Sequence, residues 1–101
     1  MPKLYTYFGL VVFFFANEHE PLHVHSRYQD YEMKAEFILE NGDIVEIKFK
    51  SVRGRKSLSA KQLADFKLLV THYAADIVQK WIDFFVLGKN IKQKSITQRI
   101  K

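Results

Sequence analysis

The stretch that decides the fold runs from Tyr31 to Lys50 and reads YEMKAEFILENGDIVEIKFK. At its centre, Asn41-Gly42 accepts the positive φ angles of a type I′ turn, whose twist matches that of two antiparallel strands. After this turn a mostly polar set of residues alternates with an apolar set, which predicts one solvent-facing and one core-facing side. The first set is Ile44, Glu46, Lys48 and Lys50, and the second is Val45, Ile47, Phe49 and Val52. The stretch therefore predicts a β-hairpin at one edge of a half-covered sheet.

Further strands are expected on the N-terminal side of this hairpin. The segment from Leu10 to Ala16 is almost wholly apolar, which is typical of a central strand covered on both faces. Phe8-Gly9 and Gln29-Asp30 are expected to form tight turns, and Pro21 interrupts the chain between them. The expected strands are 4–7, 10–16, 22–28, 31–39 and 44–50. Their order predicts an antiparallel meander of four or five strands.

One long amphipathic helix is expected after the strands. Ser59 can cap its start and Gln62 can reach back to complete a capping box. Apolar residues then recur at spacings of three and four from Leu63 to Phe85, and Gly88 is the expected C-terminal cap. The length is unusual for a globular protein, so a bend near residues 72–75 is the alternative to a straight helix. The fold class is α+β, with the helix packed on the sheet.

Size and charge predict one domain with a basic tail. The chain has 101 residues and a net charge of +5. Residues 89–101 hold five basic and no acidic residues, so the remaining 11 basic and 11 acidic residues cancel within 1–88. We expect a single α+β domain over 1–88 and a flexible basic tail over 89–101.

Composition excludes several classes of protein. With no cysteine, the chain can form neither disulfides nor thiolate metal sites. It has no apolar run long enough for a membrane-spanning helix, and the apolar run from Phe8 to Ala16 lacks the features of a secretory signal. We therefore expect a cytoplasmic protein with no membrane partner.

The best candidate for a functional site is the stretch from Asn17 to His25, because it holds three of the four histidines. If His23 and His25 lie on a strand, both rings leave the same face, roughly 7 Å apart at the backbone. Together with His19 they could bind a metal such as zinc, with Glu18 or Glu20 as a further ligand or as a hydrogen-bond acceptor for a ligating histidine. The position of His19 depends on the loop that contains Pro21.

Acid–base chemistry without a metal is the second interpretation of the same histidines. Imidazoles near neutral pH can take a proton from one oxygen and give one to another, as RNA cleavage through the 2′-hydroxyl requires. Arg27 follows His25 by two residues and would hold phosphate charge on the same strand face. The predicted catalytic set is therefore His19, His23, His25 and Arg27. The structural alternative is that the histidines only hydrogen-bond the turn around Pro21 and cover the core.

Clustered basic residues predict contact with nucleic acid or with an acidic partner. The candidates for nucleic-acid binding are Arg27, Arg53, Arg55, Lys56, Lys92 and Lys94. The alternative is that these residues form a solvated surface that keeps the protein in solution.

The residues from Glu18 to His25 carry a resemblance to a bacterial family of small proteins, domain of unknown function 4160, over residues 1 to about 88. The family pattern is an acidic residue, His, any residue, Pro, a position that is commonly Pro, and then His-Val-His. The matching residues are Glu18, His19, Pro21, His23, Val24 and His25, Leu22 departs from the pattern, and Met1 to Tyr5 and Trp81 also resemble the family. The resemblance implies a cytoplasmic protein encoded beside a second small gene, in a toxin-antitoxin-like module.

These observations predict a component of such a module that acts on RNA or binds it through the His-rich site, with ribonuclease activity as one form. A small partner protein is expected, and a homodimer is compatible with the predicted edge strand. Two rival hypotheses stay open. One is a non-catalytic protein–protein interaction module whose basic tail binds an acidic partner, and the other is a small His-based metal-binding regulatory domain.

Overall fold

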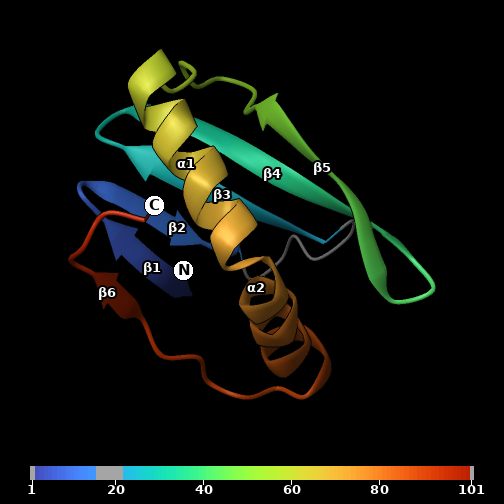
Figure 1. The fold of residues 1–101 in the computed structure, drawn as a ribbon. Coiled ribbons are helices and arrows are strands. Elements are labelled where there is room, and N and C mark those ends of the chain that lie inside the picture. The colour runs from blue at the N-terminus through green and yellow to red at the C-terminus, as the bar shows by residue number, and fades with distance from the viewer. Residues whose placement is uncertain (1, 16–21, 101) are drawn as a thin grey trace.

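The computed structural model describes residues 2–15 and 22–100, and within them six strands form one sheet (Figure 1). The order across the sheet is β5-β4-β3-β2-β1-β6. The strands are β1 Lys3–Tyr7, β2 Leu10–Phe13, β3 His23–Tyr28, β4 Tyr31–Glu40, β5 Asp43–Ser51 and β6 Lys94–Ile96. The helical segments, α1 Ala60–His72, α2 Ala74–Trp81 and the π-helical turn η1 Ile82–Val86, lie on one side of the sheet. The fold is therefore α+β, as predicted.

The antiparallel meander is confirmed for β1 to β5, which pair in chain order. Asn41 and Gly42 have φ angles of 52° and 85°, as a type I′ turn requires. At the first turn, Gly9 has a φ of 92°, and a Cβ there would lie 2.6 Å from the ring of Tyr28. This turn therefore needs glycine for its backbone angle and for the close approach of β3.

A β-bulge near the tip of the last hairpin corrects the predicted alternation. Ile38 pairs with Glu46 while the next residue, Leu39, pairs with Ile44, so Val45 is the extra residue. Ile44 consequently packs toward the core and Val45 is exposed, the reverse of the expected assignment. The bulge shifts the alternation by one residue, which period-two reasoning cannot detect.

The helical segment bends at Tyr73, with φ −104° and ψ 18°, so the expected alternative of a bend near residues 72–75 is confirmed and a single straight helix is not. No proline or glycine lies at this point. Instead, the Tyr73 ring packs on Tyr5 at 4.9 Å between centroids, and the Tyr5 hydroxyl donates a hydrogen bond to Asp76 of α2. Figure 1 shows the change of direction between α1 and α2, and these two contacts link the bend and α2 to β1. The predicted cap is present, since the Ser59 hydroxyl accepts a hydrogen bond from the Gln62 amide at 3.4 Å.

Strand β6 was not expected, because it lies in the segment predicted to be a flexible tail. Residues 94–96 pair in parallel with β1. Beyond the strand, Arg99 Nη1 lies 3.1 Å from Asp65 Oδ2, and the Ile100 amide donates to the Tyr7 hydroxyl at 3.1 Å. Residues 94–100 therefore contact the rest of the domain. That residues 89–101 are flexible and that the domain ends at residue 88 stay predictions.

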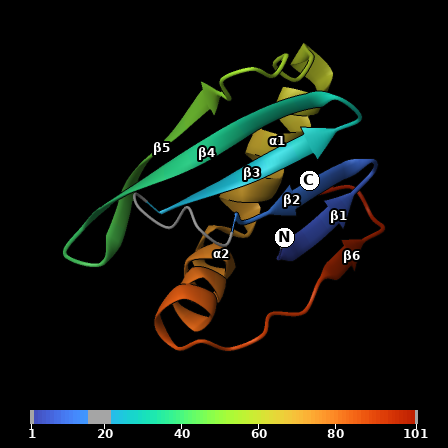
Figure 2. The ribbon, with the colours of Figure 1, turned by 180° about the vertical axis from the view of Figure 1, so that it is seen from behind.

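The core lies between the sheet and the helices. It includes Val12, Val24 and Ala35 from the sheet and Phe66, Leu69, Val70 and Ile77 from the helices, all fully buried. Seen from behind, Figure 2 shows the other face of β2, β3 and β4 with no helix in front of it. Among the residues that the structure describes, no helix has the length and apolar content needed to cross a membrane.

Candidate functional site

Strand β3 places His23, His25 and Arg27 on the face of the sheet opposite the helices, because alternate residues of a strand share a face. Its other set, Val24 and Ser26, points toward the helix-covered core, where Val24 is part of the core cluster. The pairing places Phe13 of β2 beside His25, and Lys34 of β4 on its other side. We call the surface on this side of the sheet the open face.

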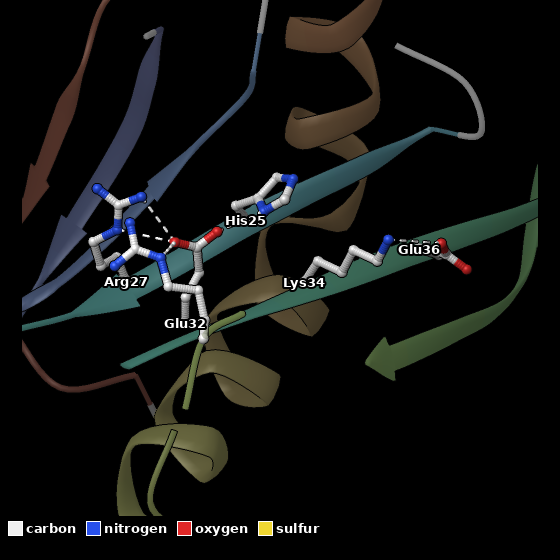
Figure 3. Close-up of polar contacts among 6 residues, drawn as sticks. His25, Arg27, Glu32, Lys34 and Glu36 are labelled. Atoms are coloured by element: carbon white, nitrogen blue, oxygen red, sulfur yellow. Dashed lines mark hydrogen bonds and ion pairs between the residues drawn. The ribbon is translucent and has the colours of Figure 1, made fainter. Parts of the chain in front are cut away.

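Glu32 of β4 is the centre of a cluster of charged groups on the open face (Figure 3). Its Oε1 accepts hydrogen bonds from Arg27 Nε at 3.0 Å and Arg27 Nη2 at 2.8 Å, and it lies 3.6 Å from Arg55 Nε. Its other oxygen, Oε2, lies 3.0 Å from His25 Nδ1. The Glu32 side chain is only 1% exposed, so this carboxylate exchanges solvation by water for these three partners. We call His25, Arg27, Glu32 and Arg55 the Glu32 cluster.

The His25 ring packs against three neighbouring rings and is 3% exposed. Phe13 stacks on it with 5.5 Å between centroids, and the rings of Phe15 and His23 meet it edge-on at 4.5 and 5.1 Å. A carboxylate can only accept a hydrogen bond, so a neutral His25 that donates to Glu32 carries its proton on Nδ1. The arrangement is the imidazole–carboxylate pair that orients histidines in acid–base and metal sites.

A second carboxylate lies two residues further along β4. Glu36 Oε1 is 2.7 Å from Lys50 Nζ and Glu36 Oε2 is 3.6 Å from Lys34 Nζ, and its cross-strand partner is His23. The hydrogen bond from Lys50 lowers the pKa of the Glu36 carboxyl below its ordinary value of 4.5, although burial acts in the opposite direction. Glu32 and Glu36 on the open face therefore each lie beside cationic side chains.

The structure brings together three of the four predicted catalytic residues, His23, His25 and Arg27. The fourth, His19, lies outside the described residues, as do Glu18 and Glu20. In the part of the chain that is described, no group of three or more His, Asp or Glu side chains could hold a metal ion. A zinc site that includes His19 stays a prediction.

The predicted nucleic-acid-binding residues are not on one surface. Arg53, Arg55 and Lys56 lie in the loop after β5, where Lys56 makes a parallel bridge to Tyr31 at the start of β4. Lys92 and Lys94 lie in or near β6, at the opposite edge of the sheet. Arg27 and Arg55 share a partner, Glu32.

Glu32 and Phe13 were missed as parts of the site. A signal for Glu32 was present, because the expected turn at Gln29-Asp30 places residue 32 opposite residue 27 in a two-residue hairpin. For Phe13 no such signal existed, since it sits in an apolar run whose two faces look alike in the sequence.

A family model described as "Domain of unknown function (DUF4160)" matches residues 9–82. The chain belongs to this family. The matched residues include every member of the Glu32 cluster and exclude β6, so the cluster is part of the DUF4160 domain and the sixth strand lies outside the match. Neither a curated protein nor a solved structure shows a significant match to the chain.

Proposed function

We propose that this DUF4160 protein acts on RNA as a component of a bacterial toxin-antitoxin-like two-gene module, with the open face of the sheet as its RNA-facing surface. The observation that carries the proposal is the Glu32 cluster, in which two guanidinium groups and one imidazole surround a single carboxylate. Such a concentration of donors for an anion, on a face that no described helix covers, suits a phosphate-bearing ligand.

Exposure separates the roles within the cluster. The side chains of Arg27 and Arg55 are 30% and 41% exposed, so each keeps donors that reach solvent while it contacts Glu32. Arginine offers five donors in a planar fork, which allows one edge to hold Glu32 and another to hold a phosphate. We therefore assign phosphate contact to Arg27 and Arg55.

His25 provides the acid–base part of the proposal. Its Nδ1 is oriented by Glu32, and Nε2 would accept or donate the proton in 2′-hydroxyl transfer, with His23 as the second imidazole 5.1 Å away. Because His25 is nearly buried, RNA reaches Nε2 only when neighbouring side chains move aside. Binding is thus the first step of this proposal, and cleavage depends on it.

The test is incubation of metal-stripped protein with labelled total RNA, with and without zinc, beside the double variant His23→Ala/His25→Ala. Cleavage by the wild type alone establishes a ribonuclease, and its dependence on zinc distinguishes metal from acid–base chemistry. Circular dichroism shows whether the variant is folded. If both folded proteins bind RNA and neither cleaves it, the protein is an RNA-binding component. If neither protein binds or cleaves RNA, the proposal is wrong.

The two rival hypotheses remain proposals with separate tests. A protein–protein interaction module would lose affinity for its partner chiefly on removal of residues 89–101, which carry the excess charge. A metal-binding domain would retain zinc through purification and lose it in the variant His23→Ala/His25→Ala, as elemental analysis shows. The homodimer is tested by light scattering, since the outer edge of β5 has no neighbouring strand among the described residues.

A further inference from the structure

Two hollows lie at the end of the sheet where β1 meets β2 and β3 meets β4. The first has a volume of about 250 Å³ and is lined by Lys3, Gly9, Val11, Phe13, Arg27 and Gln29. The second has a volume of about 330 Å³ and is lined by Gln29, Asp30, Tyr31, Gly54, Arg55 and Lys56. Gln29 lines both hollows, and we call the two hollows together the track.

The first hollow has the chemistry of a nucleobase site. Val11 supplies an apolar wall, and the Arg27 guanidinium carbon lies 5.2 Å from the centre of the fully buried Phe13 ring, which it covers. A guanidinium in this position is both a cation and a flat surface, and single-stranded RNA is commonly bound by stacking of bases on aromatic and guanidinium planes.

The second hollow has the chemistry of a phosphate site beside a stacking surface. Arg55 and Lys56 provide two cations, and the Tyr31 ring is exposed. The loop that carries Arg55 and Lys56 is fixed to β4, since the Glu32 amide donates a hydrogen bond to the Lys56 carbonyl at 2.8 Å. One acidic side chain, Asp30, also lines this hollow, so its lining side chains have a net charge of +1.

Glu32 connects the two hollows, because Arg27 of the first and Arg55 of the second contact the same oxygen, Oε1. This shared contact sets the separation of the two guanidinium groups before any ligand arrives. Preorganised donors lose less conformational entropy on binding than free side chains do.

We propose that the track binds a single-stranded RNA segment, with one base in the Val11–Phe13–Arg27 hollow and an adjacent phosphate at Arg55 and Lys56. The inference rests on the proposed function and specifies its substrate as single-stranded. A duplex keeps its bases stacked inside and cannot place one in the first hollow.

The test is fluorescence anisotropy with a labelled uridine hexamer and with a hexamer duplex, over a range of salt concentrations. The variant Arg55→Ala/Lys56→Ala removes two cations from the second hollow, and Lys61→Ala/Lys67→Ala is the matched control that removes two exposed cations from α1, on the opposite side of the sheet. We expect the first variant to weaken binding about tenfold and to reduce the slope of log K against log salt by about 0.7, the value for one phosphate contact on a single strand. The control should change binding by less than about twofold.

A second variant, Val11→Phe, fills the first hollow without changing charge. It should weaken binding of the single strand about tenfold with the salt slope unchanged, since stacking of a base is lost and no phosphate contact is. Thermal melting shows that each variant folds.

The outcomes distinguish this inference from the proposed function. If the matched control weakens binding as much as Arg55→Ala/Lys56→Ala, or if folded Val11→Phe binds normally, the track is wrong while RNA binding stands. Equal binding of the duplex overturns the assignment to single strands. If the wild type binds neither RNA at any salt concentration, the proposed function fails together with the track.

Discussion

The two faces of the sheet bury their side chains by different means. On the helix-covered face, Val24 and its neighbours are apolar and pack against α1 and α2. On the open face, the same strand presents His25 and Arg27, and the neighbouring Glu32 is as deeply buried as the core although it is charged. Close packing of apolar side chains excludes water from the covered face. On the open face, buried charged groups are stabilised by ion pairs and hydrogen bonds with specific partners. A single strand can therefore combine a stabilising side with a chemically active one, because its residues alternate.

This comparison predicts different responses to mutation. A truncation on the covered face leaves a cavity, whose cost depends on lost contacts and volume. A substitution at the centre of the open face leaves charged or polar partners without their counterpart, whose cost depends on how far those partners can reach water.

The largest effect is expected for Leu69→Ala on the covered face. Leu69 is fully buried in α1, so the variant should lose about 3–4 kcal/mol of unfolding free energy. Urea denaturation measures the loss. The matched control is Leu68→Ala in the same helix, where the side chain is 40% exposed and the loss should stay below about 1 kcal/mol. Equal losses at both positions would mean that α1 does not pack on the sheet as described.

A smaller loss is expected for Glu32→Gln on the open face. The change preserves size but removes the charge that Arg27, Arg55 and His25 surround. Loss of one partner of a buried ion pair costs about 3–5 kcal/mol, and the partial exposure of both arginines reduces the expected cost to about 2–3 kcal/mol. The control Glu36→Gln, on the same strand and face, should cost less than about 1 kcal/mol. If urea denaturation gave a larger loss of unfolding free energy for Glu36→Gln than for Glu32→Gln, the central position of Glu32 in the cluster would be contradicted.

Tyr5→Phe tests the polar contact between the covered face and α2. The substitution keeps the buried ring and removes the hydroxyl that donates to Asp76. Burial and this hydrogen bond raise the pKa of the Tyr5 hydroxyl, so it is a stable donor over the neutral range. We expect a loss of about 1–2 kcal/mol by thermal unfolding, as for a hydrogen bond to a charged group. A loss as large as that of Leu69→Ala would show that the bend at Tyr73 depends on this bond.

The smallest effect is a pH dependence that arises from Glu36. Its carboxyl pKa is lowered in the folded protein by Lys50, so its contribution to stability is present above the unfolded pKa of 4.5 and is lost as the pH falls through the folded value. The difference in unfolding free energy between the wild type and Glu36→Gln should therefore shrink between about pH 7 and about pH 3. A difference that stays constant or grows toward acid would contradict the assigned direction.

Much of the sheet was predictable because turns and alternation are local properties. Asn41-Gly42, Gly9 and Gln29 mark the turns of the meander, and the cap at Ser59 marks the start of α1. The bulge at Val45 and strand β6 were missed because each depends on the opposite strand or on a partner distant in the sequence, while the bend near Tyr73 was indicated only by the length of the helical pattern. The position of the bend was not predictable, because Tyr73 packs on Tyr5 of β1, which is far from it in the sequence.

The candidate site was predictable in part for the same reason. A period of two places His23, His25 and Arg27 on one face, and the turn at residues 29–30 places Glu32 opposite Arg27. The approach of Arg55 depends on the path of the loop after β5, and the burial of His25 depends on Phe13 and Phe15 from another strand. The sequence therefore identified the residue types of the site. It did not predict the burial of His25 or the shared contact of Arg27 and Arg55 with Glu32.

The parallel pairing of β6 with β1 has a consequence for the protein as it leaves the ribosome. Thr6 and Ser95, whose side chains touch across this pair, are 89 positions apart. At translation rates of about 5–20 residues per second, β1 is made on the order of ten seconds before its outer neighbour. During that interval the edge of β1 offers unpaired amide and carbonyl groups to any strand nearby. A nascent chain is therefore open to β-pairing with another polypeptide at the edge that the finished protein covers with its own β6.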